Sequence, residues 1–156
     1  MKPILLASDH AGFHLKRVVV DHLAARRLPV IDLGTHSEES VDYPDFADRM
    51  AEAIKAGEGN RGVLICGTGI GIAMAANRHP AVRAAVCHDV SSAQLTRRHN
   101  DANVLALGAR LIGETVALDC VDAFLGTEFE GGRHGRRVDK MSRLPALTTQ
   151  QTETDN

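Results

Sequence analysis

Aromatic side chains are scarce in this sequence, which has no tryptophan, one tyrosine and four phenylalanines among its 156 residues. Proteins that bind single-stranded nucleic acid stack bases on aromatic side chains placed between basic residues, and no such interleaving occurs here. A formal net charge of −2 also gives no general attraction to nucleic acid or to an acidic membrane surface. The composition therefore predicts neither a nucleic-acid partner nor a membrane partner.

Long apolar runs are missing as well. His10 and Lys16 interrupt the first apolar segment, so nothing approaches the length of a membrane span. Asp9 and His10 also fall where a secretory signal would have its apolar region. The cysteines form no CxxC pair, and their odd number suits reduced thiols better than a disulfide framework. They are Cys66, Cys87 and Cys120. These absences predict a cytoplasmic protein.

What the sequence does contain is a regular alternation of short apolar runs with helical patterns. The apolar runs cover residues 3–7, 30–33, 63–65, 83–87 and 103–107. Helical patterns follow them from about residue 12, over 44–57, over 72–77, over 90–98 and over 114–124. This alternation predicts a single-domain three-layer α/β/α sandwich with a five-stranded parallel, Rossmann-like sheet. The domain is expected to span residues 1–143, and the polar residues 144–156 are expected to form a disordered tail.

A glycine-rich turn follows the third apolar run. Gly67, Gly69 and Gly71 allow the backbone to approach a ligand closely, and the following helix directs free N–H groups toward the same point. The dinucleotide fingerprint fails, because its sixth position is Ile72 rather than glycine. Asp89, at the end of the next apolar run, keeps a nucleotide site open as an alternative. The spacing favours a small anion.

Cys66 stands immediately before this turn and has two interpretations. Free cysteines are often buried as small apolar residues, and this interpretation fits Cys87 and Cys120 best. Cys66 differs because the loop amides and the helix end favour the thiolate form near neutral pH. A functional thiol at Cys66 is therefore one of two open possibilities.

Histidines and arginines supply the remaining candidates. His10 and His14 have i, i+4 spacing but no glutamate between them in an HExxH arrangement, so no metal site is predicted. His10 is expected to cap a helix or to contact a phosphate. Arg133 and Arg137 stand one helical turn apart, where paired guanidinium groups could bind a phosphate. The alternative for these arginines, and for His99 behind the fourth helical pattern, is a solvated helix end or face.

Six segments occur together and in order: 8–12 (SDHAG), 42–45 (DYPD), 66–71 (CGTGIG), 99–100 (HN), 108–110 (GAR) and 130–134 (EGGRH). They resemble the ribose-5-phosphate isomerase type B family, which also includes galactose- and allose-phosphate isomerases. The resemblance covers residues 1 to about 143. It implies an aldose–ketose isomerase of the pentose phosphate pathway that interconverts ribose 5-phosphate and ribulose 5-phosphate through a cis-enediolate, with no metal or organic cofactor.

The same resemblance implies roles for particular residues. Cys66 would be the base that carries a proton between C1 and C2, Thr68 would lie beside the enediolate oxygens, and His99 would be the acid that opens the furanose ring. Asp9 would hold the ring hydroxyls. The oxyanion would be held by the amides of Gly67, Thr68, Gly69, Ile70 and Gly71. The phosphate would be bound by His10, Arg133 and Arg137.

The family is dimeric, which implies a homodimer with each site at the subunit interface. Asn100 and Arg110 would come from the partner chain, and so would His99. Some relatives use a carboxylate at position 72 as the base and lack the cysteine, whereas this sequence has Ile72 and Cys66. Two alternatives stay open: an isomerase of six-carbon sugar phosphates (allose 6-phosphate or galactose 6-phosphate) and a non-catalytic phosphosugar- or nucleotide-binding module.

Overall fold

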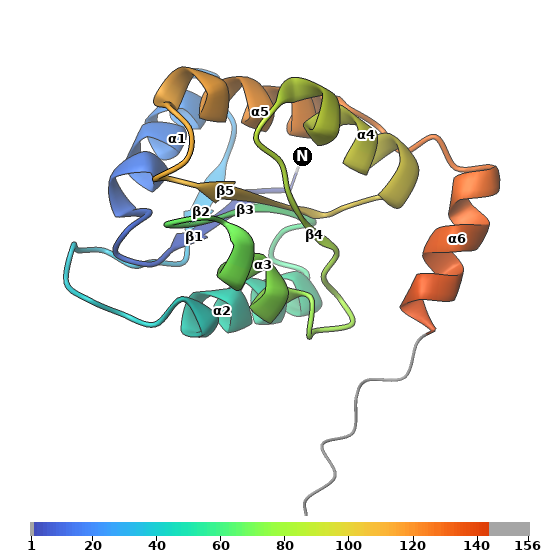
Figure 1. Cartoon of the computed structure of the whole chain (residues 1–156), viewed down its shortest axis with the longest axis horizontal. Coiled ribbons are helices and arrows are strands. Elements are labelled where there is room, and N and C mark those ends of the chain that lie inside the picture. The colour runs from blue at the N-terminus through green and yellow to red at the C-terminus, as the bar shows by residue number, and fades with distance from the viewer. Residues whose placement is uncertain (1, 144–156) are drawn as a thin grey trace, which may run out of the picture.

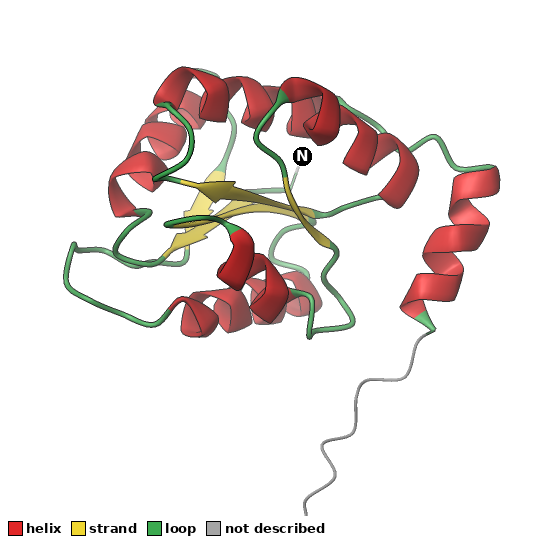
Figure 2. Cartoon of the chain, in the orientation of Figure 1, coloured by secondary structure: helices red, strands yellow, loops and turns green. Residues whose placement is uncertain are grey.

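A computed structural model describes residues 2–143 and shows a parallel five-stranded sheet between two layers of helices (Figures 1 and 2). The strands are β1 (Ile4–Ser8), β2 (Val30–Asp32), β3 (Arg61–Cys66), β4 (Ala84–Val86) and β5 (Val104–Gly108). Their spatial order is β2-β1-β3-β5-β4. The predicted α/β/α fold class is confirmed.

In the described part of the chain, six helices accompany the sheet: α1 (Phe13–Ala25), α2 (Tyr43–Ala56), α3 (Ile70–Ala76), α4 (Val90–Asn100), α5 (Glu114–Gly126) and α6 (Arg133–Ser142). Helices α1, α4 and α5 pack on one face of the sheet, and α2 and α3 pack on the other. Helix α6 lies beside the C-terminal end of α4, at the side of the molecule (Figure 1).

Strand β3 is buried on both faces, as its apolar run predicts. Val63 and Ile65 pack into the core beneath α1 and α5, whereas Leu64 and Cys66 pack into the core beneath α2 and α3. This alternation follows from the two-residue period of a strand. It places the side chain of Cys66 on the same face of the sheet as the helix that follows it.

The helix boundaries follow local chemistry, and the differences from expectation at α3 and α4 concern candidate site residues. The carboxylate of Asp89 caps α4 by accepting a hydrogen bond from the Ser92 amide at 2.7 Å, and this bond lowers the pKa of Asp89. Helix α3 begins at Ile70 rather than at residue 72, because Gly69 already turns the chain with a φ of 75°. Helix α4 continues through Asn100, so His99 lies in its last turn rather than behind it.

The expected disordered tail, residues 144–156, lies outside the described residues. Within residues 2–143, no helix has the length and apolar character needed to cross a bilayer.

Candidate active site

The turn after β3 holds the thiol of Cys66 among backbone amides. The amide of Gly69 donates a hydrogen bond to Sγ of Cys66 at 3.1 Å. Gly69 has a φ of 75°, and a Cβ at this position would lie 2.8 Å from the carbonyl carbon of Leu107 in the next strand. Only glycine fits this position. Cys66 as a whole is 4% exposed and, although it packs in the apolar core, its sulfur accepts a hydrogen bond at the N-terminal end of α3.

The end of β5 runs alongside this turn because β5 is the direct neighbour of β3. Cys66 pairs with Gly108, and the amide of Arg110 donates to the carbonyl of Gly67 at 3.0 Å. The guanidinium of Arg110 lies next to Gly67, with its nitrogen 3.3 Å from where a Cβ would be. Arg110 was expected from the partner chain, but the structure places it beside the same chain's turn, since the strand order brings residues 108–110 to it.

Asp9 and His10 follow β1, the other neighbour of β3. The amide of Asp9 donates to the carbonyl of Ile65, next to Cys66, at 3.2 Å. One carboxylate oxygen of Asp9 accepts the amide of Gly12 at 3.1 Å, which leaves the second oxygen for a hydroxyl. Nδ1 of His10 accepts the amide of Val41 at 3.2 Å, so Nε2 carries the proton and can donate to an anion.

Thr68 and Ile70 are exposed at the tip of the turn, and Oγ1 of Thr68 accepts the amide of Ile70 at 3.2 Å. Tyr43 lies beside this turn, since a Cβ at Gly71 would be 3.0 Å from its hydroxyl oxygen. The sequence analysis gave Tyr43 no role, although it belongs to the DYPD segment that supports the resemblance. The structure therefore adds a phenol hydroxyl to this group.

Cys87, Cys120 and Ile72 are buried in the apolar core. Ile72 is fully buried in the core with Phe46 and Met50. Burial raises the pKa of Cys87, and it raises that of Cys120 to about 11, so both thiols stay protonated at neutral pH. Their interpretation as small apolar core residues is confirmed.

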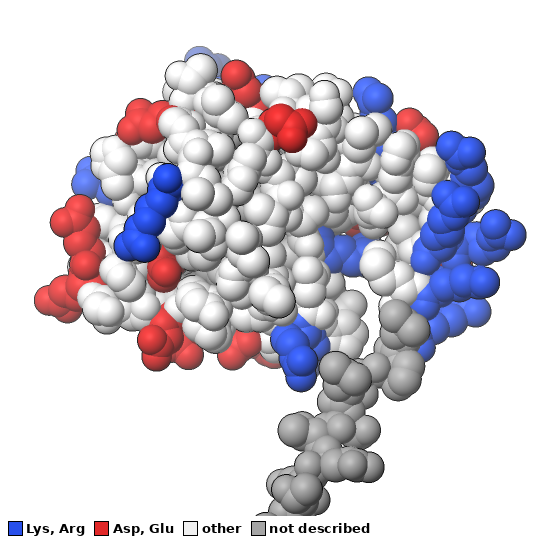
Figure 3. Space-filling model, in the orientation of Figure 1, with Lys and Arg blue, Asp and Glu red and all other residues white. Residues whose placement is uncertain are grey.

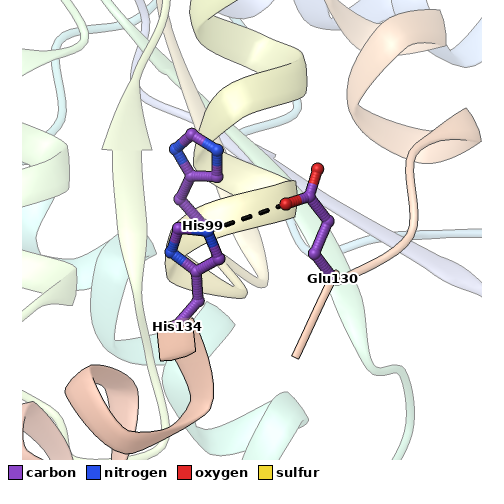
Figure 4. A group of neighbouring side chains, drawn as sticks. All are labelled: His99, Glu130 and His134. Carbon is purple, nitrogen blue, oxygen red and sulfur yellow. Dashed lines mark ion pairs between the residues drawn. The ribbon is translucent and has the colours of Figure 1, made fainter. Parts of the chain in front are cut away.

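A second group of predicted residues lies on α4 and α6. The ring of His99 stacks on that of His134, with centroids 4.3 Å apart and planes inclined by 11° (Figure 4). Nε2 of His134 lies 3.6 Å from a carboxylate oxygen of Glu130. Burial and the nearby His99 and Arg133 lower the pKa of His134, while Glu130 opposes this shift. No role was predicted for Glu130 or His134, although both occur in the EGGRH segment.

Basic side chains follow the length of α6, and the space-filling view shows them along its outer side (Figure 3). They are Arg133, Arg136, Arg137 and Lys140. Arg137 also lines a cavity of about 310 Å³ together with His99, Asn100 and His134. A larger cavity of about 570 Å³ lies alongside, between α6 and the end of α3, and also reaches Asn100.

Within one chain, the group around Cys66 and the group around His99 lie at opposite ends of the strands. Cys66 is the last residue of β3 and lies at the C-terminal ends of the strands. His99 and Asn100 are the last residues of α4, shortly before β5 begins, and therefore lie at the N-terminal ends of the strands (Figure 1). A strand of five residues is roughly 17 Å long, so the two ends lie about that far apart. The residues at the Cys66 end are Asp9, His10, Cys66, Gly67, Thr68, Gly69, Ile70, Gly71 and Arg110. Those at the other end are His99, Asn100, Arg133 and Arg137.

Known proteins are similar to this chain in both sequence and fold. Residues 4–141 match the family described as Ribose/Galactose Isomerase. Ribose-5-phosphate isomerase B of Escherichia coli is 50% identical over 144 residues, which cover 92% of this chain and 97% of the relative. The structure of ribose-5-phosphate isomerase B from Clostridium thermocellum is 56% identical with a TM-score of 0.89, covering 91% of this chain and 95% of that one.

A third relative is informative about ligands. Ribose-5-phosphate isomerase B from Mycoplasma genitalium, solved with bound ribulose-5-phosphate, is 43% identical with a TM-score of 0.85 and covers 90% of this chain and 94% of that one. The similarity in sequence and in fold extends over almost the whole described chain. This chain belongs to the ribose/galactose isomerase family.

Proposed function

We propose that this protein interconverts ribose 5-phosphate and ribulose 5-phosphate, with Cys66 as the base. The observation that carries the proposal is the hydrogen bond from the Gly69 amide to Sγ of Cys66. The thiolate is the form of a cysteine that takes a proton, and the Gly69 amide at the start of α3 donates directly to this sulfur. The family membership and the relative with bound ribulose-5-phosphate support the same substrate.

The reaction is an isomerisation, which relocates two hydrogen atoms of the sugar and leaves its composition unchanged. The thiolate takes the proton from C2 of the open-chain aldose, which leaves a cis-enediolate, and the thiol so formed, whose proton can exchange with solvent, delivers a proton to C1. A second proton moves from the C2 oxygen to the C1 oxygen, so the product is the ketose. The amides of residues 67–71 would stabilise the enediolate oxygen, with the Gly69 amide shared with Sγ of Cys66 and the Ile70 amide shared with Oγ1 of Thr68. Thr68 and Asp9 would contact the sugar hydroxyls.

We further propose that a homodimer completes each site. One chain carries the Cys66 group at one edge of its sheet and the group of His99, Asn100 and Arg137 at the opposite edge. A partner chain can bring its own His99, Asn100 and Arg137 to the Cys66 of this chain. Large apolar side chains are exposed around the turn, as expected for a surface that a partner covers. They are Ile70, Met74 and Leu111, which are 51%, 69% and 56% exposed.

In such a dimer His99 opens the furanose ring as a general acid, and Arg137 binds the phosphate from the partner's side. Arg133 extends from the same helix, and His10 and Arg110 supply donors from the chain that carries Cys66. Phosphate contacts far from C1 and C2 orient the sugar over the thiolate.

The test is to incubate the protein with ribose 5-phosphate in heavy water and to measure the ribulose 5-phosphate formed, the deuterium at its C1 and the deuterium at C2 of the remaining ribose 5-phosphate. The same assay on allose and galactose phosphates decides between five-carbon and six-carbon substrates. Cys66→Ala is expected to abolish turnover while sugar-phosphate binding persists, and Cys87→Ala, a buried cysteine without a role, is expected to keep turnover. Binding without exchange in the unaltered protein would indicate a sensing module instead.

A further inference from the structure

Three metal-ligating side chains come together at the C-terminal end of α4. His99 lies in the last turn of α4, Glu130 lies between α5 and α6, and His134 lies in the first turn of α6. One ligand atom from each residue lies within 4.8 Å of the other two (Figure 4). We propose that this trio binds a zinc-like divalent transition-metal ion and that the bound ion inhibits the enzyme.

The donor set decides the kind of ion. Two imidazole nitrogens and one carboxylate oxygen suit zinc, cobalt or nickel, whereas magnesium and calcium prefer oxygen ligands alone. Three protein ligands leave a fourth position for water. The cavity of about 310 Å³ beside His99 and His134 gives room for that water.

The backbone already places the three residues. The amide of Glu130 donates to the carbonyl of Arg98, the residue before His99, at 3.1 Å. Gly131 and Gly132 have φ values of 66° and 55°, and these two residues turn the chain so that Glu130 lies 3.6 Å from Nε2 of His134. The ligands are therefore held together by main-chain contacts before any ion binds.

Binding requires only side-chain movement. A tetrahedral site with bonds of about 2.1 Å separates its ligand atoms by about 3.4 Å, so the present spacing has to close by up to about 1.4 Å. The stacked rings have to turn so that their lone pairs converge, and the Glu130 side chain, which is 51% exposed, is free to follow. Because Arg137 lines the same cavity, the ion should bind reversibly rather than as a structural zinc.

The inhibitory consequence rests on the proposed function. A nitrogen of His99 that binds a metal ion cannot give a proton to the furanose ring oxygen. The ion should therefore block turnover of the ring-closed sugar while leaving proton transfer by Cys66 intact. Saturating zinc is expected to lower turnover of the cyclic substrate by about a hundredfold, the scale of general acid catalysis.

The binding experiment uses the full chain, freed of metal with a chelator and titrated with Zn²⁺ by calorimetry and with Co²⁺ by absorption spectroscopy. One ion per chain is expected, with a spectrum of nitrogen and oxygen ligation. Glu130→Gln and His134→Gln are expected to weaken binding at least about tenfold. Glu128→Gln, a change at another exposed glutamate, is expected to leave it unchanged.

A thiolate charge-transfer band in the Co²⁺ spectrum would assign the ion to a cysteine and overturn the proposal. Full affinity in Glu130→Gln and His134→Gln, or no binding at all, would do the same. Kinetically, Glu130→Gln is expected to keep basal turnover and to lose zinc inhibition. If the trio binds zinc but turnover of the cyclic sugar is unaffected, the inhibitory part of the proposal is overturned, and the ring-opening role of His99 fails with it.

Discussion

Gly108 offers a direct test of whether the position of the turn after β3 controls catalysis. Gly108 pairs with Cys66 across the sheet and donates its amide to Nε2 of His88 at 3.1 Å. Its φ lies outside the left-handed region, so alanine can adopt the backbone conformation without strain. The only perturbation in Gly108→Ala is therefore the added methyl group.

That methyl group would lie 2.6 Å from the carbonyl oxygen of Thr68 and 2.9 Å from its Cα. Non-bonded carbon atoms pack best at about 3.5–4.0 Å, so the turn has to move away by about 1 Å. Over-packing of this kind costs about 1–3 kcal/mol of the free energy of unfolding. A displacement of about 1 Å at a reacting group can cost about a hundredfold in rate. We expect kcat for ribose 5-phosphate to fall by about a hundredfold.

The assay is steady-state conversion of ribose 5-phosphate to ribulose 5-phosphate, with urea denaturation run on the same samples. KM should change less than kcat, because Arg133 and Arg137, which would bind the phosphate, lie at the opposite end of the strands from the turn. Gly126→Ala is the matched control, since no atom lies within 4 Å of its added Cβ. Unchanged kcat in a measurably destabilised Gly108→Ala would show that the turn's position does not control the chemistry.

Three further predictions concern other parts of the molecule. His99→Asn should lower turnover of ring-closed ribose 5-phosphate much more than that of an open-chain analogue, and equal losses in parallel kinetic assays would argue against ring opening. Lys16→Met should lower the free energy of unfolding in urea by about 3 kcal/mol, because the fully buried ammonium group donates to Asp32 and to the carbonyl of Thr35. Arg17→Met, at an exposed neighbour, should stay within about 0.5 kcal/mol, and a similar small loss in Lys16→Met would contradict the reasoning. The raised pKa of Cys120 should cause a loss of stability of up to about 2.7 kcal/mol as the pH rises from 9.0 toward about 11, since the unfolded thiol ionises first. Denaturation at several alkaline pH values should show a shallower decline in Cys120→Ala, and parallel curves would refute this assignment.

Local sequence was enough to predict the five strands, the helices α1 to α5 and the glycine turn behind Cys66. The apolar runs and helical patterns specify five strands and the helices between them, because side-chain periodicity is a property of neighbouring residues. Cys66 stands at a strand end before a glycine turn in sequence and structure alike. The helix at Ile70 begins earlier than expected because the conformation of Gly69 is set by its close contact with Leu107.

Only the tertiary structure decided which distant residues meet. The order β2-β1-β3-β5-β4 places β5 beside β3, and this neighbour relation brings Arg110 to Gly67. The direction of α4 places His99 at the far edge of the sheet, where it stacks on His134. No local pattern encodes these contacts, because strand order and helix packing depend on how the whole chain buries its apolar surface.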